Sequence, residues 1–310
     1  METPDEARLS DEEWLRHRDR LPPAPGATAA PPPARRGVNR RAVLLGGAGV
    51  AGLGVLAPAG VGALTERMPG STDWIPGSGD GGPAGPQASC VDASALTPSA
   101  RVGRARIIYE PTSAPATMRF DPGFLRQLER WLADWDATSR YGGASQLWSY
   151  GAHVLKDECR SWHANGRAVD ISRLRSGGRL LVSARTDLWH TAPAEQQARL
   201  RRRYWTLAAS LHLHFAHVLT HHFDALHANH LHVDNGLSGS GMSRFRRGSR
   251  VQNQAVQAIC QTIWGQPGQV TGEWSDTRDQ AGPVLHRLGV SDLGRQASWQ
   301  AFLRASVERG

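Results

Sequence analysis

The sequence predicts an α+β fold, with a small antiparallel sheet flanked by helices and followed by a C-terminal helical subdomain. Three observations predict it. Short apolar runs of strand length recur between residues 104 and 182. Longer segments at 121–138 and 193–223 carry apolar residues at helical spacing. A separate helical pattern covers 251–264, after a Gly/Ser/Arg-rich loop at 236–248.

The individual elements follow in chain order. The expected strands are Arg104–Glu110, Gln146–Tyr150, Ala152–Leu155, Val169–Ile171 and Leu180–Val182. The helix at 121–138 should begin at Asp121-Pro122, because proline is tolerated in the first turn of a helix. Pro193 opens the second long segment, which we interpret as a helix or a pair of helices. In the last segment, Trp299, Phe302 and Leu303 are candidates for a helical core.

The chain divides into four regions by composition. Residues 1–64 are predicted to be a disordered stretch ending in a targeting signal, and residues 65–100 a Gly/Pro-rich linker. Residues 101–240 carry the motifs described below, and residues 250–310 form the helical domain.

The targeting signal rests on Asn39-Arg40-Arg41 followed by the uncharged, Gly/Ala-rich residues 42–64, which resembles a twin-arginine export signal. Two outcomes stay open: cleavage after a small-residue site such as Ala57-Pro-Ala59, or retention of 42–64 as a membrane anchor. Both predict that the protein works outside the cytoplasm, in the extracellular space, in the cell wall or anchored to the membrane.

The positive net charge indicates which classes of binding partner to expect. The formal net charge is +8 and the sequence pI is near 10.3. A basic exported protein would adhere to an anionic wall or membrane surface. The sequence shows neither a DNA-binding helix pattern nor an aromatic–basic RNA motif, so nucleic acid is not expected as a partner.

Two histidine motifs carry the chemistry. They read Ser161-Trp-His163-Ala-Asn-Gly166-Arg-Ala168-Val-Asp170 and His227-Ala-Asn-His230-Leu-His232-Val-Asp234. A catalytic zinc ion takes three protein ligands and keeps one position for water. His163, Asp170 and His232 are the candidates for those ligands, so the motifs predict a single Zn²⁺ site, although the same ligand set tolerates other metals.

The spacing within the motifs has a physical basis. Residues two apart on a strand point to the same face, so His230 and His232 should lie side by side. Gly166 and Ala168 are small, which lets the chain turn tightly and bring His163 and Asp170 to one point. Asp234 is a candidate to accept a hydrogen bond from an imidazole and fix its tautomer.

A second histidine-rich stretch looks similar but predicts no metal site. His212 and His214 are also two apart, but on a helix such residues point about 200° from each other. His214, His217 and His221 would line one helix face, where we interpret them as surface or packing histidines.

The pattern Ser-x-His-x-x-Gly-x-Ala-x-Asp followed by His-x-His resembles the zinc peptidases that cleave D-amino-acid bonds in peptidoglycan. These include D-Ala-D-Ala carboxypeptidases and murein endopeptidases, and they share a fold with lysostaphin-type endopeptidases and the hedgehog signalling domain. Within this group, the ending His-x-x-His-x-His-x-Asp is most similar to the extensin-like C-terminal domain of bacteria. The resemblance covers roughly residues 107–236.

The resemblance implies roles for the motif residues. His163, Asp170 and His232 would be the metal ligands, His230 the general base, and His227 a group that orients water or stabilises the transition state. Arg160 or Arg167 is a further candidate for that last role. The carboxypeptidase branch uses a Glu three residues before its last ligand histidine, where this chain has Asn229. A Glu-based mechanism is therefore excluded, and a histidine base is required.

These implications predict an exported zinc metallopeptidase-like protein that acts on peptidoglycan or cell-wall peptides, as a DD- or LD-peptidase. The alternatives are a zinc-containing wall-binding module without turnover, and a metallo-hydrolase for another wall polymer. The run from Gly272 to Gly289 loosely resembles small helical peptidoglycan-binding modules; the alternative is a helical cap on the zinc domain. Cys159 is predicted to be structural, paired with either Cys90 or Cys260.

Overall fold

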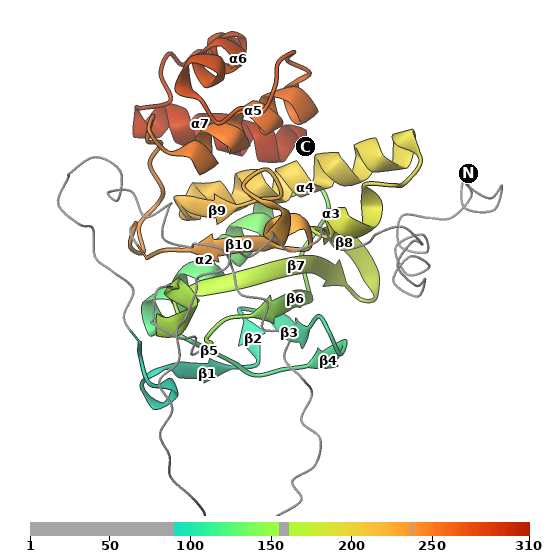
Figure 1. Ribbon diagram of the computed structural model, residues 1–310, viewed down its shortest axis with the longest axis vertical. Coiled ribbons are helices and arrows are strands. Elements are labelled where there is room, and N and C mark those ends of the chain that lie inside the picture. Colours follow the sequence, from blue (N-terminus) through green and yellow to red (C-terminus); the bar gives the residue numbers. More distant parts are fainter. Residues whose placement is uncertain (1–89, 155–160, 237) are drawn as a thin grey trace, which may run out of the picture. The chain divides into compact units, whose positions relative to one another are not determined.

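The computed structural model describes residues 90–154, 161–236 and 238–310, which all lie in one compact unit (Figure 1). The predicted export signal, most of the predicted linker, Cys159 and Arg160 lie outside the described residues. Cys90 is disulfide-bonded and Cys260 is a free, buried thiol, so Cys260 takes no part in a pairing. The helices that are described include none with the length and apolarity needed to cross a membrane.

The unit is built around an eight-stranded sheet with the order β2-β3-β6-β7-β10-β9, in which β4 also pairs with β3 and β8 with β7. Its strands are β2 (Arg101–Val102), β3 (Ala105–Tyr109), β4 (Ala114–Pro115), β6 (Gln146–Gly151), β7 (Ala168–Ser176), β8 (Arg179–Ser183), β9 (His217–Leu219) and β10 (Leu231–Asp234). A short helix, η2 (Ala93–Ala95), precedes a separate two-stranded sheet of β1 (Thr97–Ser99) and β5 (Met118–Phe120).

The α+β class is confirmed, but the prediction of an antiparallel sheet is wrong. Strands β3 and β6 run parallel, which makes the sheet mixed. The helix α2 (Pro122–Thr138) lies between them in the chain and supplies the crossover that a parallel pair requires. The strand expected at Ala152–Leu155 is also wrong within the described residues, since β6 ends at Gly151 after two register shifts.

Helix α2 begins where the sequence predicts. Oδ1 of Asp121 accepts a hydrogen bond from the backbone N–H of Phe124 at 2.9 Å, which satisfies one of the unpaired donors of the first turn. The apolar face of the helix buries Phe124, Leu128, Trp131 and Trp135 completely. Each of these side chains contributes roughly 1.5–3 kcal/mol through burial, so this face holds α2 against the helix at residues 194–214 and against β2.

The second long helix ends earlier than expected. After the short helix α3 (Thr186–Trp189), α4 covers Ala194–His214, and Phe215 already has extended backbone angles. The chain then forms β9, which pairs with β10, instead of continuing as helix to Phe223. Helical periodicity in this stretch is overridden by strand pairing, because tertiary contacts outweigh the small differences in local propensity.

The C-terminal helices are α5 (Arg250–Trp264), α6 (Trp274–Arg287) and α7 (Gln296–Arg309). Helices α5 and α7 pack against α4, which lies between them and the sheet (Figure 1). Trp299, Phe302 and Leu303 are fully buried. The indole N–H of Trp299 donates to Oγ of Ser243 at 2.7 Å, which ties α7 to the loop before α5.

Candidate metal centre

Two of the predicted ligands face each other across neighbouring strands. Asp170 on β7 and His232 on β10 are direct partners in the antiparallel register. Their strand neighbours Val169, Ile171 and Val233 point to the opposite face and belong to the hydrophobic core. The alternation of each strand therefore buries its apolar side and presents Asp170 and His232 together on the other side.

The third predicted ligand comes from a short helix before β7. His163 lies on η4 (Trp162–Asn165), which begins at the capping residue Ser161. Gly166 ends η4 with φ at +69°, and a Cβ at this position would lie 2.8 Å from the backbone nitrogen of Asp121. Because only glycine fits this turn without strain, Gly166 reverses the chain and returns His163 towards Asp170.

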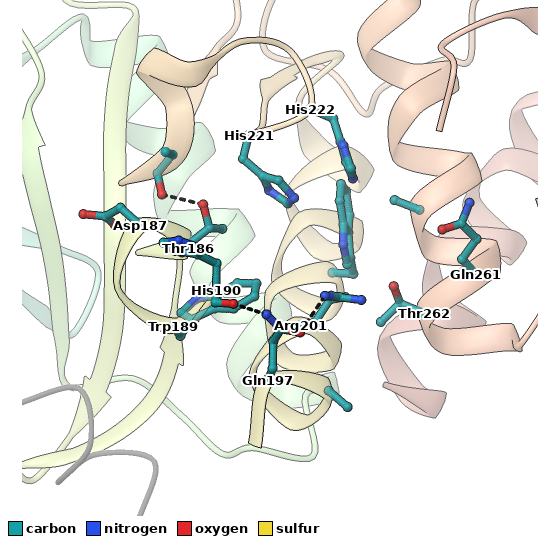
Figure 2. A pocket seen from close by; sticks show the side chains of 14 residues that line it. Thr186, Asp187, Trp189, His190, Gln197, Arg201, His221, His222, Gln261 and Thr262 are labelled. Carbon is teal, nitrogen blue, oxygen red and sulfur yellow. Dashed lines mark hydrogen bonds between the residues drawn. The ribbon is translucent and has the colours of Figure 1, made fainter. Parts of the chain in front are cut away.

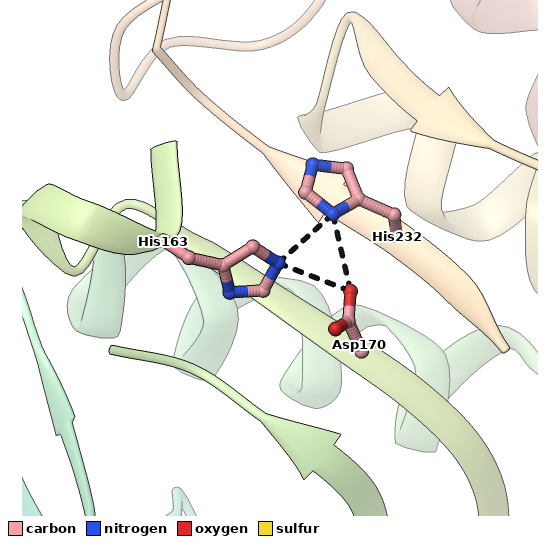
Figure 3. A group of neighbouring side chains, drawn as sticks. All are labelled: His163, Asp170 and His232. Carbon is pink, nitrogen blue, oxygen red and sulfur yellow. Dashed lines mark hydrogen bonds and ion pairs between the residues drawn. The ribbon is translucent and has the colours of Figure 1, made fainter. Parts of the chain in front are cut away.

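The three side chains converge on one point (Figure 3). Nε2 of His163 lies 3.1 Å from Nδ1 of His232 and 3.2 Å from Oδ1 of Asp170. Nδ1 of His232 lies 3.1 Å from the same carboxylate oxygen. These three residues form a group that could hold a metal ion.

An oxygen atom behind each ligand imidazole fixes which ring nitrogen points inward as a lone pair. The carbonyl oxygen of Ala152 lies against Nδ1 of His163, so that nitrogen carries the proton and Nε2 is left as a lone pair. Oδ2 of Asp234 lies 3.4 Å from Nε2 of His232, which leaves Nδ1 of His232 facing Asp170. When both rings are neutral, two lone pairs and a carboxylate oxygen therefore meet at this point.

This arrangement fits a metal ion. Three acceptor atoms repel one another unless a cation lies among them. For a tetrahedral zinc ion with ligand distances of about 2.0–2.1 Å, neighbouring donor atoms lie about 3.3 Å apart. The separations of 3.1–3.2 Å among His163, Asp170 and His232 are close to that value.

The two remaining motif histidines lie beside this group. Nε2 of His230 is 3.5 Å from Oδ1 of Asp170, and Nδ1 of His230 is 2.6 Å from Oδ1 of Asn229. The imidazole of His227 is 5.1 Å from that of His230, and Nδ1 of His227 is 2.7 Å from Oδ1 of Asp224. Both rings therefore also have their N–H held by an oxygen on the outer side.

The charges of the group follow from burial and mutual contact. Burial works to raise the pKa of Asp170, but the imidazoles of His163 and His230 hold it well below its usual range. Burial would lower the pKa of His232, yet its contacts with Asp170 and Asp234 raise it to about 9. The pocket thus favours a positive charge at His232, which a proton or a metal ion can supply. Burial lowers the pKa of His230 to about 4, which keeps this imidazole neutral.

Several residues around the centre were not predicted from the sequence. Asn229 was noted only as a departure from a Glu, although its side chain orients His230. His217 was predicted on a helix face, but it lies on β9 with Nδ1 3.3 Å from Oδ1 of Asp234. Asp224 stands three residues before His227 in a local turn, a spacing that could have indicated their contact.

The histidines of the second histidine-rich stretch are dispersed. His212 is fully buried against Trp299, and Nε2 of His214 contacts Oδ2 of Asp134 at 2.8 Å. The prediction that His214, His217 and His221 share one helix face is wrong, because α4 ends at His214.

Arg167 also differs from its predicted role at the centre. Its guanidinium donates to the side chain and backbone oxygens of Asn235, at 2.9 and 2.7 Å, and lies over the ring of Trp162. Arg167 is therefore a structural contact between η4 and the end of β10.

A buried ionic cluster lies near the centre on the neighbouring strands. Oε1 of Glu110 contacts Arg173 at 2.7 Å and Arg185 at 2.8 Å, and Oε2 accepts from Ser172 at 2.7 Å. The ring of Tyr150 lies 5.9 Å from that of His230, and burial raises its pKa to about 12. Tyr150 therefore keeps its hydroxyl proton beside the candidate base.

The comparisons with known proteins agree with this geometry. Residues 150–244 match the family model described as extensin-like protein C-terminus, a range that includes both histidine motifs. No curated protein and no solved structure matches the chain. Residues 150–244 of this chain are therefore similar to the extensin-like protein C-terminal domain.

Proposed function

We propose that this protein is an exported, zinc-dependent hydrolase that cleaves peptides of the bacterial cell wall. The observation that carries the proposal is the meeting of three acceptor atoms, from His163, Asp170 and His232, within 3.1–3.2 Å of one another. A binding site for a cation built from two imidazoles and one carboxylate leaves a coordination position open, which is typical of catalytic zinc sites.

Zinc bound there would lower the pKa of a water molecule and polarise a substrate carbonyl. His230 is the group that accepts the proton of the attacking water. Its Nε2 faces the centre, its Nδ1 is held by Asn229, and burial keeps the ring neutral and able to accept. His227, held by Asp224, stands beside it and orients the water or stabilises the charge that develops on the substrate oxygen.

The substrate class is supported by the motif pattern, which resembles that of peptidases acting on D-amino-acid bonds in peptidoglycan. Export is supported by Asn39-Arg40-Arg41 and the uncharged residues 42–64. The net charge of +8 suits adhesion to an anionic wall.

The first experiment measures the metal content of the purified full-length chain by elemental analysis. We expect about one zinc per chain in the wild type, and its loss in His163→Ala and Asp170→Ala. His286→Ala is the matched control, because His286 is exposed at the end of α6 and should leave the zinc in place. A folded, zinc-supplemented wild type that holds no metal would overturn the proposal.

The second experiment incubates purified peptidoglycan with the zinc-loaded chain and detects new amino termini by mass spectrometry. His230→Gln should keep its zinc and lose about 10²–10⁴-fold in rate, the usual contribution of a general base. Undiminished turnover in this variant would remove His230 from the mechanism. Zinc-loaded wild type that binds the wall without cutting it would instead identify a non-catalytic binding module.

A further inference from the structure

A cavity lies apart from the candidate metal centre. It has a volume of about 820 Å³ and opens between α3, α4, α5 and the loop that follows β9 (Figure 2). His221 and His222 enter it from the loop, Arg201 from α4, and Gln261 from α5. The residues of the candidate metal centre are not among those that line it.

The negative charge in the lining of this cavity is neutralised by a neighbouring arginine, whereas the positive charge is not paired with a carboxylate in the lining. Asp187 is the one carboxylate in its lining, and it turns away from the histidines in Figure 2. Both oxygens of Asp187 accept from the guanidinium of Arg185, at 2.8 and 2.9 Å, so its charge is already compensated. Arg201 donates to the neutral amide oxygen of Gln197 at 3.1 Å. The cavity therefore presents a guanidinium that is hydrogen-bonded to an uncharged amide.

The imidazoles of His221 and His222 add hydrogen-bond donors beside the guanidinium of Arg201. The rings of His221 and His222 are half-buried and lie 4.3 Å apart. Burial lowers the pKa of both, and the positive charge of Arg201 lowers it further. This influence of Arg201 on both rings indicates that the three side chains share one electrostatic environment, in which an anion would be stabilised.

The aromatic lining argues against a neutral sugar as the ligand. Trp205 is 1% exposed, because the ring of His222 stacks on it at 5.5 Å. Trp189 is 2% exposed and packs edge-to-face against Tyr204. Neither indole offers an open face on which a sugar ring could stack, whereas the cationic and imidazole groups face the cavity.

We propose that this cavity is an anion-binding site for a carboxylate or phosphate group, held by Arg201 with His221 and His222. A guanidinium beside N–H donors is the arrangement that binds these groups most strongly. The polar side chains of Gln261 and Thr262 on α5 supply further hydrogen bonds to the rest of the ligand. This binding does not depend on hydrolysis at the metal centre.

The cavity and one of the candidate catalytic histidines share one structural element. Ala228, at the end of η5 (Ala225–Ala228), lines the cavity, and its carbonyl oxygen accepts from Oγ1 of Thr186 at 2.7 Å. The preceding residue, His227, is the candidate helper beside His230. An anionic part of a long wall polymer bound here would therefore lie along the same short helix as the candidate catalytic group.

The test titrates the full-length chain with inorganic phosphate and, separately, with sodium acetate, using calorimetry. The chain is first treated with EDTA, so that phosphate cannot bind to a metal ion. We expect saturable binding of one anion per chain, and the preferred probe distinguishes a phosphate-bearing from a carboxylate-bearing ligand. Arg201→Gln should weaken binding about tenfold or more, since it removes a charge-assisted hydrogen bond.

Two controls make the result specific. Arg199→Gln removes a charge from the same helix, where Arg199 is exposed and paired with Glu195, and should leave the affinity unchanged. Arg201→Lys keeps the charge but loses the forked donors of the guanidinium, and should recover only part of the binding. Equal affinity in Arg201→Gln and the wild type, equal loss in Arg199→Gln, or saturable binding of methyl glucoside without either anion would overturn the proposal.

Discussion

Asp234 stands behind His232 on the side away from the candidate metal position. Its Oδ2 lies 3.4 Å from Nε2 of His232, while Nδ1 of the same ring faces Asp170 at 3.1 Å. The other oxygen of Asp234 accepts from the backbone N–H of Gly236 at 3.0 Å and lies 3.3 Å from Nδ1 of His217. Burial would raise the pKa of Asp234, but these two imidazoles hold it well below its usual range, so it remains a carboxylate.

This contact predicts that Asp234→Asn weakens zinc binding without removing a ligand. Carboxylates behind ligand histidines contribute about 10–100-fold to metal affinity, because they orient the ring and increase its basicity. Competition with a chelator would measure the loss. Asp224→Asn is the matched control, since Asp224 holds His227 in the same way and His227 is not a proposed ligand. Equal losses in both variants would mean that general destabilisation is responsible.

Gly236→Ala should distort the short helix η4, which carries His163, through steric overlap. A Cβ at residue 236 would lie 1.9 Å from Cε2 of Trp162, the buried residue directly before His163. Overpacking of this kind costs about 1–3 kcal/mol in the free energy of unfolding, and more where the neighbour cannot move. Gly241→Ala meets no atom within 4 Å and should be nearly neutral. Denaturant unfolding of both variants checks this, and equal stabilities would contradict it.

Glu110→Gln should destabilise the protein strongly. The carboxylate of Glu110 is 3% exposed and contacts the buried guanidinium groups of Arg173 and Arg185. Removing one partner of a buried ion pair costs about 3–5 kcal/mol, since the remaining charges stay buried without compensation. Glu195→Gln breaks a pair in which the Glu side chain is 91% exposed, and should change stability by less than about 1 kcal/mol. Thermal unfolding measures the Tm of both variants, and equal decreases in Tm would contradict this prediction.

His212 should make the fold sensitive to acid. Burial lowers its pKa in the folded state to about 3, from about 6.5 for an exposed histidine. Between these values the unfolded chain binds a proton that the folded chain does not. The stabilisation is therefore complete above pH 6.5 and is lost as the pH falls towards 3, at about 1.4 kcal/mol per unit.

Replacing His212 by Leu removes this titration. Denaturant unfolding of His212→Leu at several values between pH 3 and 6.5 should show a shallower loss of stability than the wild type. His286→Leu replaces an exposed histidine and should keep the wild-type slope. Parallel slopes for His212→Leu and the wild type would show that His212 stays accessible to protons.

The sequence correctly predicted the features that depend on residues close together in the chain. The helix start at Asp121-Pro122 is set by a side-chain cap within four residues, and its apolar face is set by helical spacing. The two-residue spacing of His230 and His232, together with the short strand around Asp170, predicted which side chains could meet. These patterns depend on neighbours in the chain, so they can be interpreted without the fold.

Contacts between distant segments could not be predicted in this way. The end of α4 at His214 depends on pairing of β9 with β10, and the mixed character of the sheet depends on β3 meeting β6 across α2. His217 became a neighbour of Asp234 only through that pairing.

The sequence by itself determined the candidate ligand types and the chemistry that they would favour: two imidazoles and a carboxylate from His163, Asp170 and His232. The tertiary structure decided their convergence, the oxygen atom behind each ring, and the separate cavity around Arg201 and His222. The physical reason is that residue identity and local spacing fix the donor atoms, whereas distances between atoms far apart in the chain are set by strand register and helix packing.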